Sequence, residues 1–165
     1  MSINLEFPWN QETFLNAGEI AYKYKMNYSY KKYVGYLFLG MIVLGILRSV
    51  GQKDYLVLYL GTVLSVYWFY IKGLLQKNRL KKQFEKERVD NLKMKISINK
   101  TGVKINGNFI PWSHISLVVV HPKGFLLERK EGYPYLPATA FKSDKDVLEF
   151  LKILEEKNIP TRNVK

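Results

Sequence analysis

Two long apolar stretches near the start of the chain constrain its fold more than any other feature. They run from Tyr33 to Leu47 and from Tyr55 to Ile71, and neither contains a charged residue. Residues 48–54, which connect them, are long enough only for a turn. As a helix, the second stretch would cover roughly 26 Å, close to the roughly 30 Å hydrocarbon core of a bilayer. The pattern therefore predicts a helical hairpin that crosses a membrane twice, with spans at about 33–51 and 55–71.

The alternative is a pair of buried core helices in a soluble domain. Both stretches are shorter than the roughly 20 apolar residues of an average spanning helix. However, they are apolar on every face, whereas a helix with one wet side shows polar residues every three or four positions. The first stretch can also continue past Arg48, because the long stem of an arginine lets its charge reach outward. These observations favour the membrane hairpin.

Basic residues around the hairpin predict its orientation. Four lysines precede the first stretch, whereas the connecting turn carries only Arg48 and Lys53, beside Asp54. Five more basic residues follow the second stretch closely: Lys72, Lys77, Arg79, Lys81 and Lys82. Short segments rich in Lys and Arg stay on the cytoplasmic side of a membrane. We therefore expect both termini in the cytoplasm and the turn outside.

Tyrosines are concentrated around the same hairpin. Ten of the twelve tyrosines fall between residues 22 and 70, and a tryptophan accompanies them. Amphipathic aromatic rings collect at the boundary between lipid headgroups and acyl chains. We therefore predict membrane-interface anchors at five positions: Tyr33, Tyr36, Tyr55, Trp68 and Tyr70.

The net charge of +12 is unevenly distributed, and half of the excess lies in residues 72–95. Residues 72–92 are rich in Leu, Gln, Lys and Glu and predict a basic helical stalk beyond the second span. Anionic lipid headgroups would be its nearest counter-charge, so the five basic residues named above are candidate headgroup or partner contacts. A simply solvated helix face remains an alternative. Nucleic acid is disfavoured, because Phe84 is the only aromatic residue among these charges.

The segments on either side predict a mixed α+β architecture. Residues 2–7 alternate apolar and polar side chains like a half-buried strand, and Asn10 is placed to cap a helix over 11–24. This strand and helix make up an N-terminal region over residues 1–32, which the predicted orientation places in the cytoplasm. Residues 93–142 predict five or six short antiparallel strands, and Ser143 caps an amphipathic helix over 144–157. The expected outline over 93–165 is a small, bent antiparallel sheet or barrel capped by a C-terminal helix, as in pleckstrin-homology-like (PH-like) domains.

Short motifs in this region resemble the C-terminal domain of the bacterial YcxB-like proteins. They are Ile98-Asn-Lys-Thr-Gly-Val103, Ile110-Pro-Trp-Ser-His-Ile115, Phe125-Leu-Leu127, Tyr135-Leu-Pro-Ala-Thr-Ala-Phe141-Lys-Ser143 and Phe150-Leu-Lys-Ile-Leu154. The preceding strand, helix and hairpin also resemble that family, so the likeness covers most of the chain. The resemblance implies a small protein of the bacterial cytoplasmic membrane with a PH-like cytoplasmic domain, and the family has no established enzymatic activity.

The inventory of reactive side chains predicts a protein without catalysis, metal or cofactor. There is no cysteine, and His114 and His121 are the only histidines. No local spacing assembles a metal-ligand set, and His114 is expected at the rim of the sheet. Ser113, Ser116 and Ser143 lack the Gly-x-Ser-x-Gly context of an activated nucleophile.

We therefore expect a membrane-anchored binding protein, and its sharper form is self-immunity against a membrane-active peptide toxin or bacteriocin. The immunity hypothesis rests on architectural analogy alone. The alternative is a structural or regulatory subunit of a larger membrane complex, with a membrane protein as partner. Homo-oligomers are also open, because Gly61-x-x-x-Ser65, with Gly40 and Gly45 on the first span, would let helices approach closely within the hairpin or between subunits.

Overall fold

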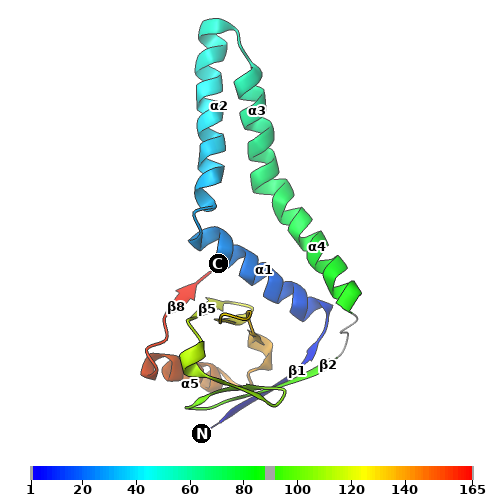
Figure 1. Cartoon of the computed structure of the whole chain (residues 1–165), viewed down its shortest axis with the longest axis vertical. Helices are drawn as coiled ribbons and strands as arrows, with labels where there is room; N and C mark the ends of the chain where they lie inside the picture. Colours follow the sequence, from blue (N-terminus) through cyan, green and yellow to red (C-terminus); the bar gives the residue numbers. More distant parts are fainter. Residues whose placement is uncertain (1, 88–91, 165) are drawn as a thin grey trace. The chain divides into compact units, whose positions relative to one another are not determined.

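The computed structural model of the chain describes residues 2–87 and 92–164 and has an α+β architecture (Figure 1). Residues 1, 88–91 and 165, which fall in the predicted N-terminal, stalk and C-terminal regions, lie outside the described residues. The chain divides into two units. Residues 25–83 form the hairpin unit, and residues 1–24 together with 84–165 form the discontinuous unit.

The hairpin unit contains two antiparallel helical arms (Figure 1). Its elements are α2 (Lys32–Gln52), α3 (Leu56–Val66), the π-helical turn η1 (Tyr67–Ile71) and α4 (Lys72–Glu87), which passes into the discontinuous unit at residue 84. The helices predicted at about 33–51 and 55–71 are confirmed, and the second continues into α4 as expected. Among the described residues, two helices are long and apolar enough to cross a membrane, Lys32–Gln52 and Leu56–Lys86. Only 11% of each apolar window is buried inside the protein.

Two glycines let the arms of the hairpin approach closely. A Cβ atom added to Gly45 would collide with the backbone N and Cα of Leu58 on the other arm. A Cβ added to Gly61 would lie 2.9 Å from the backbone N of Ile42. By contrast, nothing lies within 4 Å of a Cβ added to Gly40. The small residues at 45, 61 and 65 are thus buried within the hairpin, whereas Gly40 faces outward.

Sheet A of the discontinuous unit combines one strand that precedes the hairpin in sequence with three strands that follow it. Its strands follow the order β1 (Ile3–Trp9), β2 (Leu92–Ile98), β3 (Gly102–Ile105) and β4 (Asn108–Pro111). All three pairings are antiparallel, and β1 pairs with β2 from Ile3 opposite Ile98 to Trp9 opposite Leu92. Sequence analysis set residues 1–32 apart from the C-terminal region, but this pairing places β1 in the same sheet as β2.

Sheet B differs from the expected antiparallel barrel. Its order is β7 (Tyr135–Pro137), β6 (Gly124–Glu128), β5 (Leu117–His121) and β8 (Thr161–Asn163). The strand β8 was not predicted, and it pairs with β5 in parallel. Sheets A and B do not close into a barrel. Pro111 and Pro137 end their strands because proline has no N–H to continue a ladder. Short 3₁₀ turns follow, η2 (Trp112–His114) and η3 (Ala138–Ala140), whereas the sequence pattern predicts strand up to Trp112 and again over 138–141.

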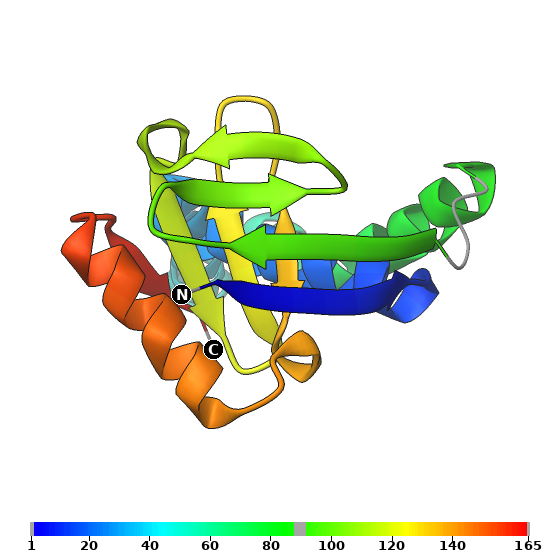
Figure 2. The same cartoon turned by 90° about the horizontal axis from the view of Figure 1, so that it is seen from below.

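The main core fills the space between the two sheets. Figure 2 shows the strands of sheet A running across those of sheet B, with α5 (Asp144–Glu156) beside them. Phe150 of α5 is fully buried in this core and packs on Phe125, Phe141 and Trp112. Trp112 is also buried, and its Nε1–H donates to the carbonyl of Asn99 at 2.9 Å.

Both predicted helix caps of this unit are confirmed. The Ser143 side chain accepts a hydrogen bond from the backbone N–H of Asp146 at 3.3 Å, at the start of α5. The Asn10 carboxamide oxygen accepts from the backbone N–H of Thr13 at 2.9 Å, at the start of α1 (Gln11–Tyr28). Helix α1 runs four residues beyond its predicted end. Its residues Ile20 and Tyr24 pack on the outer face of sheet B in a second, smaller core.

Candidate functional site

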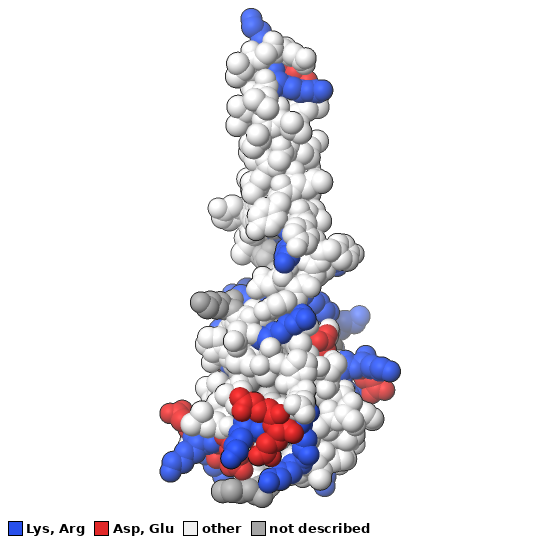
Figure 3. Space-filling model, turned by 90° about the vertical axis from the view of Figure 1, so that its left-hand side faces the viewer, with Lys and Arg blue, Asp and Glu red and all other residues white. Residues whose placement is uncertain are grey.

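The shaft of the hairpin unit, defined as residues 33–47 and 55–71, contains no charged residue. On the face drawn in Figure 3, the upper part of the helical hairpin is uncharged over most of its length, and charges gather at the connecting turn. There, Arg48 and Asp54 approach to 4.0 Å, and the Asp54 carboxylate accepts from the backbone N–H of Leu56 at 3.1 Å. Apart from its glycines and a few small polar residues, the shaft exposes aliphatic and aromatic side chains.

The predicted interface anchors divide into two groups. Tyr33, Tyr36, Tyr55 and Tyr70 are exposed, and the Lys32 ammonium lies 5.0 Å from the centre of the Tyr33 ring. Trp68 is only half-exposed, and its ring packs edge-on against Phe38 of the other arm.

The predicted basic contacts also fall into two groups. The Lys72 ammonium lies 3.3 Å from the centre of the Trp68 ring and donates to the Met26 sulfur at 3.7 Å. The structure therefore brings this predicted headgroup contact together with a predicted anchor. The other four are exposed on α4: Lys77, Arg79, Lys81 and Lys82. At 100° per residue Lys77 and Lys81 share one face of the helix, whereas Arg79 and Lys82 point away from it, so the four do not form a single basic face.

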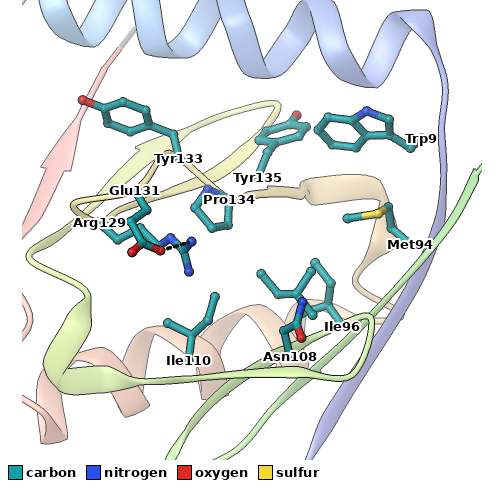
Figure 4. A pocket seen from close by; sticks show the side chains of 12 residues that line it. Trp9, Met94, Ile96, Asn108, Ile110, Arg129, Glu131, Tyr133, Pro134 and Tyr135 are labelled. Atoms are coloured by element: carbon teal, nitrogen blue, oxygen red, sulfur yellow. Dashed lines mark hydrogen bonds and ion pairs between the residues drawn. The ribbon is translucent and has the colours of Figure 1, made fainter. Parts of the chain in front are cut away.

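A cavity opens between sheet A and the turn that joins β6 to β7. This inter-sheet pocket has a volume of about 340 Å³ and draws residues from β1, β2, β3 and β4. Figure 4 shows Ile96 and Ile110 on one side, and the rings of Trp9, Tyr133 and Tyr135 on the other. The walls are therefore mostly apolar, which is typical of sites for small organic molecules.

Of the described residues that line the pocket, Arg129 alone is cationic. Figure 4 shows its guanidinium pointing into the space between the walls. Its Nη2 lies 3.0 Å from a carboxylate oxygen of Glu131, whereas its buried Nε has no hydrogen-bond partner among residues 2–87 and 92–164. A buried donor without a partner is costly, which makes this atom a candidate for ligand binding.

A tight turn holds Arg129 at the edge of the pocket. Arg129 and Gly132 exchange backbone hydrogen bonds of 3.2 and 3.4 Å across the turn. Gly132 has φ +137°, a conformation that residues with a Cβ rarely adopt. The next hydrogen bond, from the Leu127 N–H to the Pro134 carbonyl at 2.8 Å, continues the hairpin toward β6 and β7. The backbone position of Arg129 is thus set by local structure.

Both tyrosine hydroxyls at the pocket are used within the protein. The Tyr135 hydroxyl donates to the Lys123 carbonyl at 2.7 Å, and burial raises the pKa of this phenol to about 12. The Tyr133 hydroxyl donates to Glu128 at 3.5 Å, and its pKa is raised by burial and by the adjacent carboxylate. Tyr24 also donates to Glu128, at 3.0 Å, and burial followed by this hydrogen bond raises its pKa. All three phenols stay protonated at neutral pH, and Tyr133 and Tyr135 form part of the pocket wall.

The two histidines lie in different environments, one exposed and one buried. His114 is exposed in η2, in line with the expected rim position. His121 is buried at the end of β5, and its Nδ1 accepts from the backbone N–H of Lys123 at 3.1 Å. Burial, with Lys23 next in importance, lowers the pKa of His121, while Glu19 opposes and Lys123 adds to this effect. No group of three or more His, Asp or Glu residues could hold a metal ion in the described part of the chain.

Sequence reasoning did not identify the inter-sheet pocket. In the sequence, Arg129 only ends the strand pattern that begins at Phe125, and Glu131-Gly132 has the composition of an ordinary turn. The available signal was local: a charged turn directly followed by Tyr133-Pro-Tyr135, a stiff aromatic segment. Trp9 could not be connected to this segment from spacing, because more than 100 residues separate them.

Comparison of the chain with protein-family models, with curated proteins and with solved structures found no match in any of the three.

Proposed function

We propose that the chain is a non-enzymatic binding protein of the bacterial cytoplasmic membrane, anchored by its helical hairpin. The exposed apolar surface of the hairpin unit carries this proposal. Thirteen aliphatic or phenyl side chains between Leu37 and Ile71 are exposed. Fully burying one such side chain contributes about 1.5–3 kcal/mol, so covering these partly exposed groups with lipid gains on the order of 10–20 kcal/mol.

The pairing of β1 with β2 supports two crossings rather than one. Residues 3–9 precede the hairpin and residues 92–98 follow it, yet they are neighbours in one sheet. Paired strands lie on the same side of any membrane, which argues against a single crossing between them. Two helices of sufficient length lie in that segment, and this supports the two crossings that we propose.

The distribution of basic residues supports an orientation with both termini in the cytoplasm. In this arrangement Arg48, Lys53 and Asp54 lie outside the cell. The inner boundary between headgroups and acyl chains then holds five side chains: Tyr33, Tyr36, Trp68, Tyr70 and Lys72. Tyr55 lies at the outer boundary. The four exposed basic residues of α4 then face anionic headgroups and water from different sides of a solvated helix.

The discontinuous unit supplies the binding function. Two packed sheets with a C-terminal amphipathic helix support a PH-like domain in outline, although the sheets do not close into the expected antiparallel barrel. We propose membership of the YcxB-like family and, as the sharper hypothesis, self-immunity through capture of a membrane-active peptide toxin.

Cysteine labelling tests the anchor directly, because the chain has no cysteine of its own. Gln52→Cys at the turn and Ser113→Cys in η2 are matched single replacements of exposed residues. We expect a membrane-impermeant thiol reagent to label the first in intact cells and the second only after lysis. Release of the protein by alkaline carbonate, or equal labelling of both positions in intact cells, would refute the anchor.

The immunity hypothesis needs a separate measurement. The full chain, expressed in a strain sensitive to membrane-active peptide bacteriocins, should raise the concentration needed for killing relative to the same strain with an empty vector. Unchanged killing across a panel of such peptides would exclude self-immunity and leave the anchored binding protein standing.

One observation favours a second candidate, a subunit of a larger membrane complex. Gly40 lies on the outward face of α2, with exposed Leu37 and Leu44 one turn away on either side. A small residue on a lipid-facing surface lets another membrane helix approach closely. Purification in mild detergent should then recover a membrane partner that a Gly40→Leu variant loses, and recovery of the chain alone would count against this candidate.

A further inference from the structure

We infer that the inter-sheet pocket binds a small apolar monocarboxylate, with Arg129 as its counter-charge. The inference deepens the proposed binding function by naming a ligand class for the discontinuous unit. It does not depend on the orientation of the hairpin in a membrane.

The free edge of Arg129 matches a carboxylate. Nε and Nη2 lie on the same side of a guanidinium and form the fork that a carboxylate accepts with both oxygens. The Glu131 carboxylate contacts Nη2 at 3.0 Å, and the buried Nε has no partner in the described part of the protein. A ligand carboxylate that replaces Glu131 accepts from both atoms and satisfies the unpaired donor.

Glu131 is easily displaced. Its side chain is 82% exposed, whereas that of Arg129 is 28% exposed. Exposed ion pairs contribute little to stability because water competes for both charges. Moving Glu131 into solvent therefore costs little, and its position over Arg129 makes it a competitor for the same guanidinium.

The walls select an apolar body. Aliphatic Ile96 and Ile110 face the rings of Trp9 and Tyr133 across the cavity (Figure 4). The hydroxyls of Tyr133 and Tyr135 are already donated to Glu128 and Lys123. Sugars and nucleotides need many polar partners, and this lining offers few. A dianionic phosphate would meet one cation beside a carboxylate.

The cavity volume limits the ligand to a small molecule. At about 340 Å³ it lies at the lower end of the roughly 300–1,000 Å³ typical of ligand pockets. A single aromatic or short aliphatic acid fills such a space. Phenylpropionate, which combines one ring with one carboxylate and is soluble in water, is a suitable probe, and phenylpropionamide is its neutral match.

Calorimetric titration of the full chain in lipid nanodiscs tests the assignment, with protein-free nanodiscs as the blank for partitioning into lipid. We expect phenylpropionate to bind, and phenylpropionamide to bind at least about tenfold more weakly, because it loses the charge-assisted contact. Arg129→Gln should weaken binding of the acid by a similar factor. Lys130→Gln removes an equal charge from the same turn without touching the pocket and should leave binding unchanged. Glu131→Gln removes the competing carboxylate and should tighten binding.

Several results would overturn the inference. They are undetectable binding of phenylpropionate at millimolar concentration, equal binding of the acid and the amide, equal weakening by Arg129→Gln and Lys130→Gln, or weaker binding by Glu131→Gln. Tighter binding of a peptide with an apolar C-terminal residue would assign the pocket to a protein partner instead. If Arg129→Gln fails to fold, as judged by circular dichroism, the acid–amide pair and Glu131→Gln still decide the question. Failure of the membrane anchor would show separately, as failure of the chain to incorporate into nanodiscs.

Discussion

Replacement of Gly45 by alanine should destabilise the hairpin, whereas the same replacement at Gly40 should not. Both residues lie in α2, five residues apart, and both changes add a single methyl group. At Gly45 the methyl would collide with the backbone of Leu58, which cannot rotate away as a side chain can. At Gly40 nothing lies within 4 Å of it.

The size of the effect follows from two opposing contributions. Alanine is a better helix former than glycine by about 0.5–1 kcal/mol, and both variants gain this amount. Carbon atoms pack at about 3.5–4.0 Å, so the methyl at position 45 pushes the two arms apart by about 1 Å. Overpacking of this kind costs about 1–3 kcal/mol. We therefore expect Gly45→Ala to be less stable than Gly40→Ala by about 1–3 kcal/mol.

The free energy of unfolding can be measured in mild-detergent micelles by titration with a denaturing detergent, with helix content followed by circular dichroism. Because both variants carry the same methyl on the same helix, their difference isolates the contact with Leu58. If Gly45→Ala is as stable as Gly40→Ala, the close approach of the two arms is not a feature of the folded protein.

Two further predictions concern the discontinuous unit. Phe150→Ala should lower the free energy of unfolding by about 3–5 kcal/mol, because Phe150 is 0% exposed. Leu148→Ala, at a 65% exposed site of the same helix, should change it by less than about 0.5 kcal/mol. Similar shifts in the melting temperature for both variants would contradict the assigned core. Burial and Lys23 lower the pKa of His121, so the unfolded chain binds more protons in acid and stability should fall as the pH drops below about 6.5. His121→Gln should flatten the dependence of the melting temperature on pH and His114→Gln should preserve it, and equal profiles would refute this.

Local patterns in the chain predict its local structure well. The charge-free stretches 33–47 and 55–71 predict two helices because they are long, and a helix satisfies its backbone hydrogen bonds within one segment. The caps at Asn10 and Ser143 depend on residues three positions apart and were recognised for that reason. The strand boundaries near Asn106-Gly107 follow from the turn chemistry of that pair, and both residues have positive φ.

Long-range pairings could not be predicted in the same way. The contact of β1 with β2 joins residues separated by the whole hairpin, and β8 joins β5 in parallel after an intervening helix. Single-strand periodicity records which face is buried but not which strand lies alongside. The inter-sheet pocket depends on these pairings, because Trp9 and Met94 face Tyr135 only once both sheets exist. Arg129 therefore gave no recognisable signal, although its turn was identified.

The pairing of β1 with β2 has a practical consequence for protein engineering. Residues 25–83 are an insertion into a unit whose two parts, 1–24 and 84–165, fold together. Removing the membrane hairpin by starting the chain at residue 72 would therefore also remove β1 and α1. The fragment 72–165 would leave the inner side chains of Ile96 and Ile98 without the strand that covers their edge. A water-soluble form should instead be made by excision, with a flexible linker joining Tyr24 to Phe84. Circular permutation that begins at β2 and returns to β1 through a linker offers a second route to the same soluble fold.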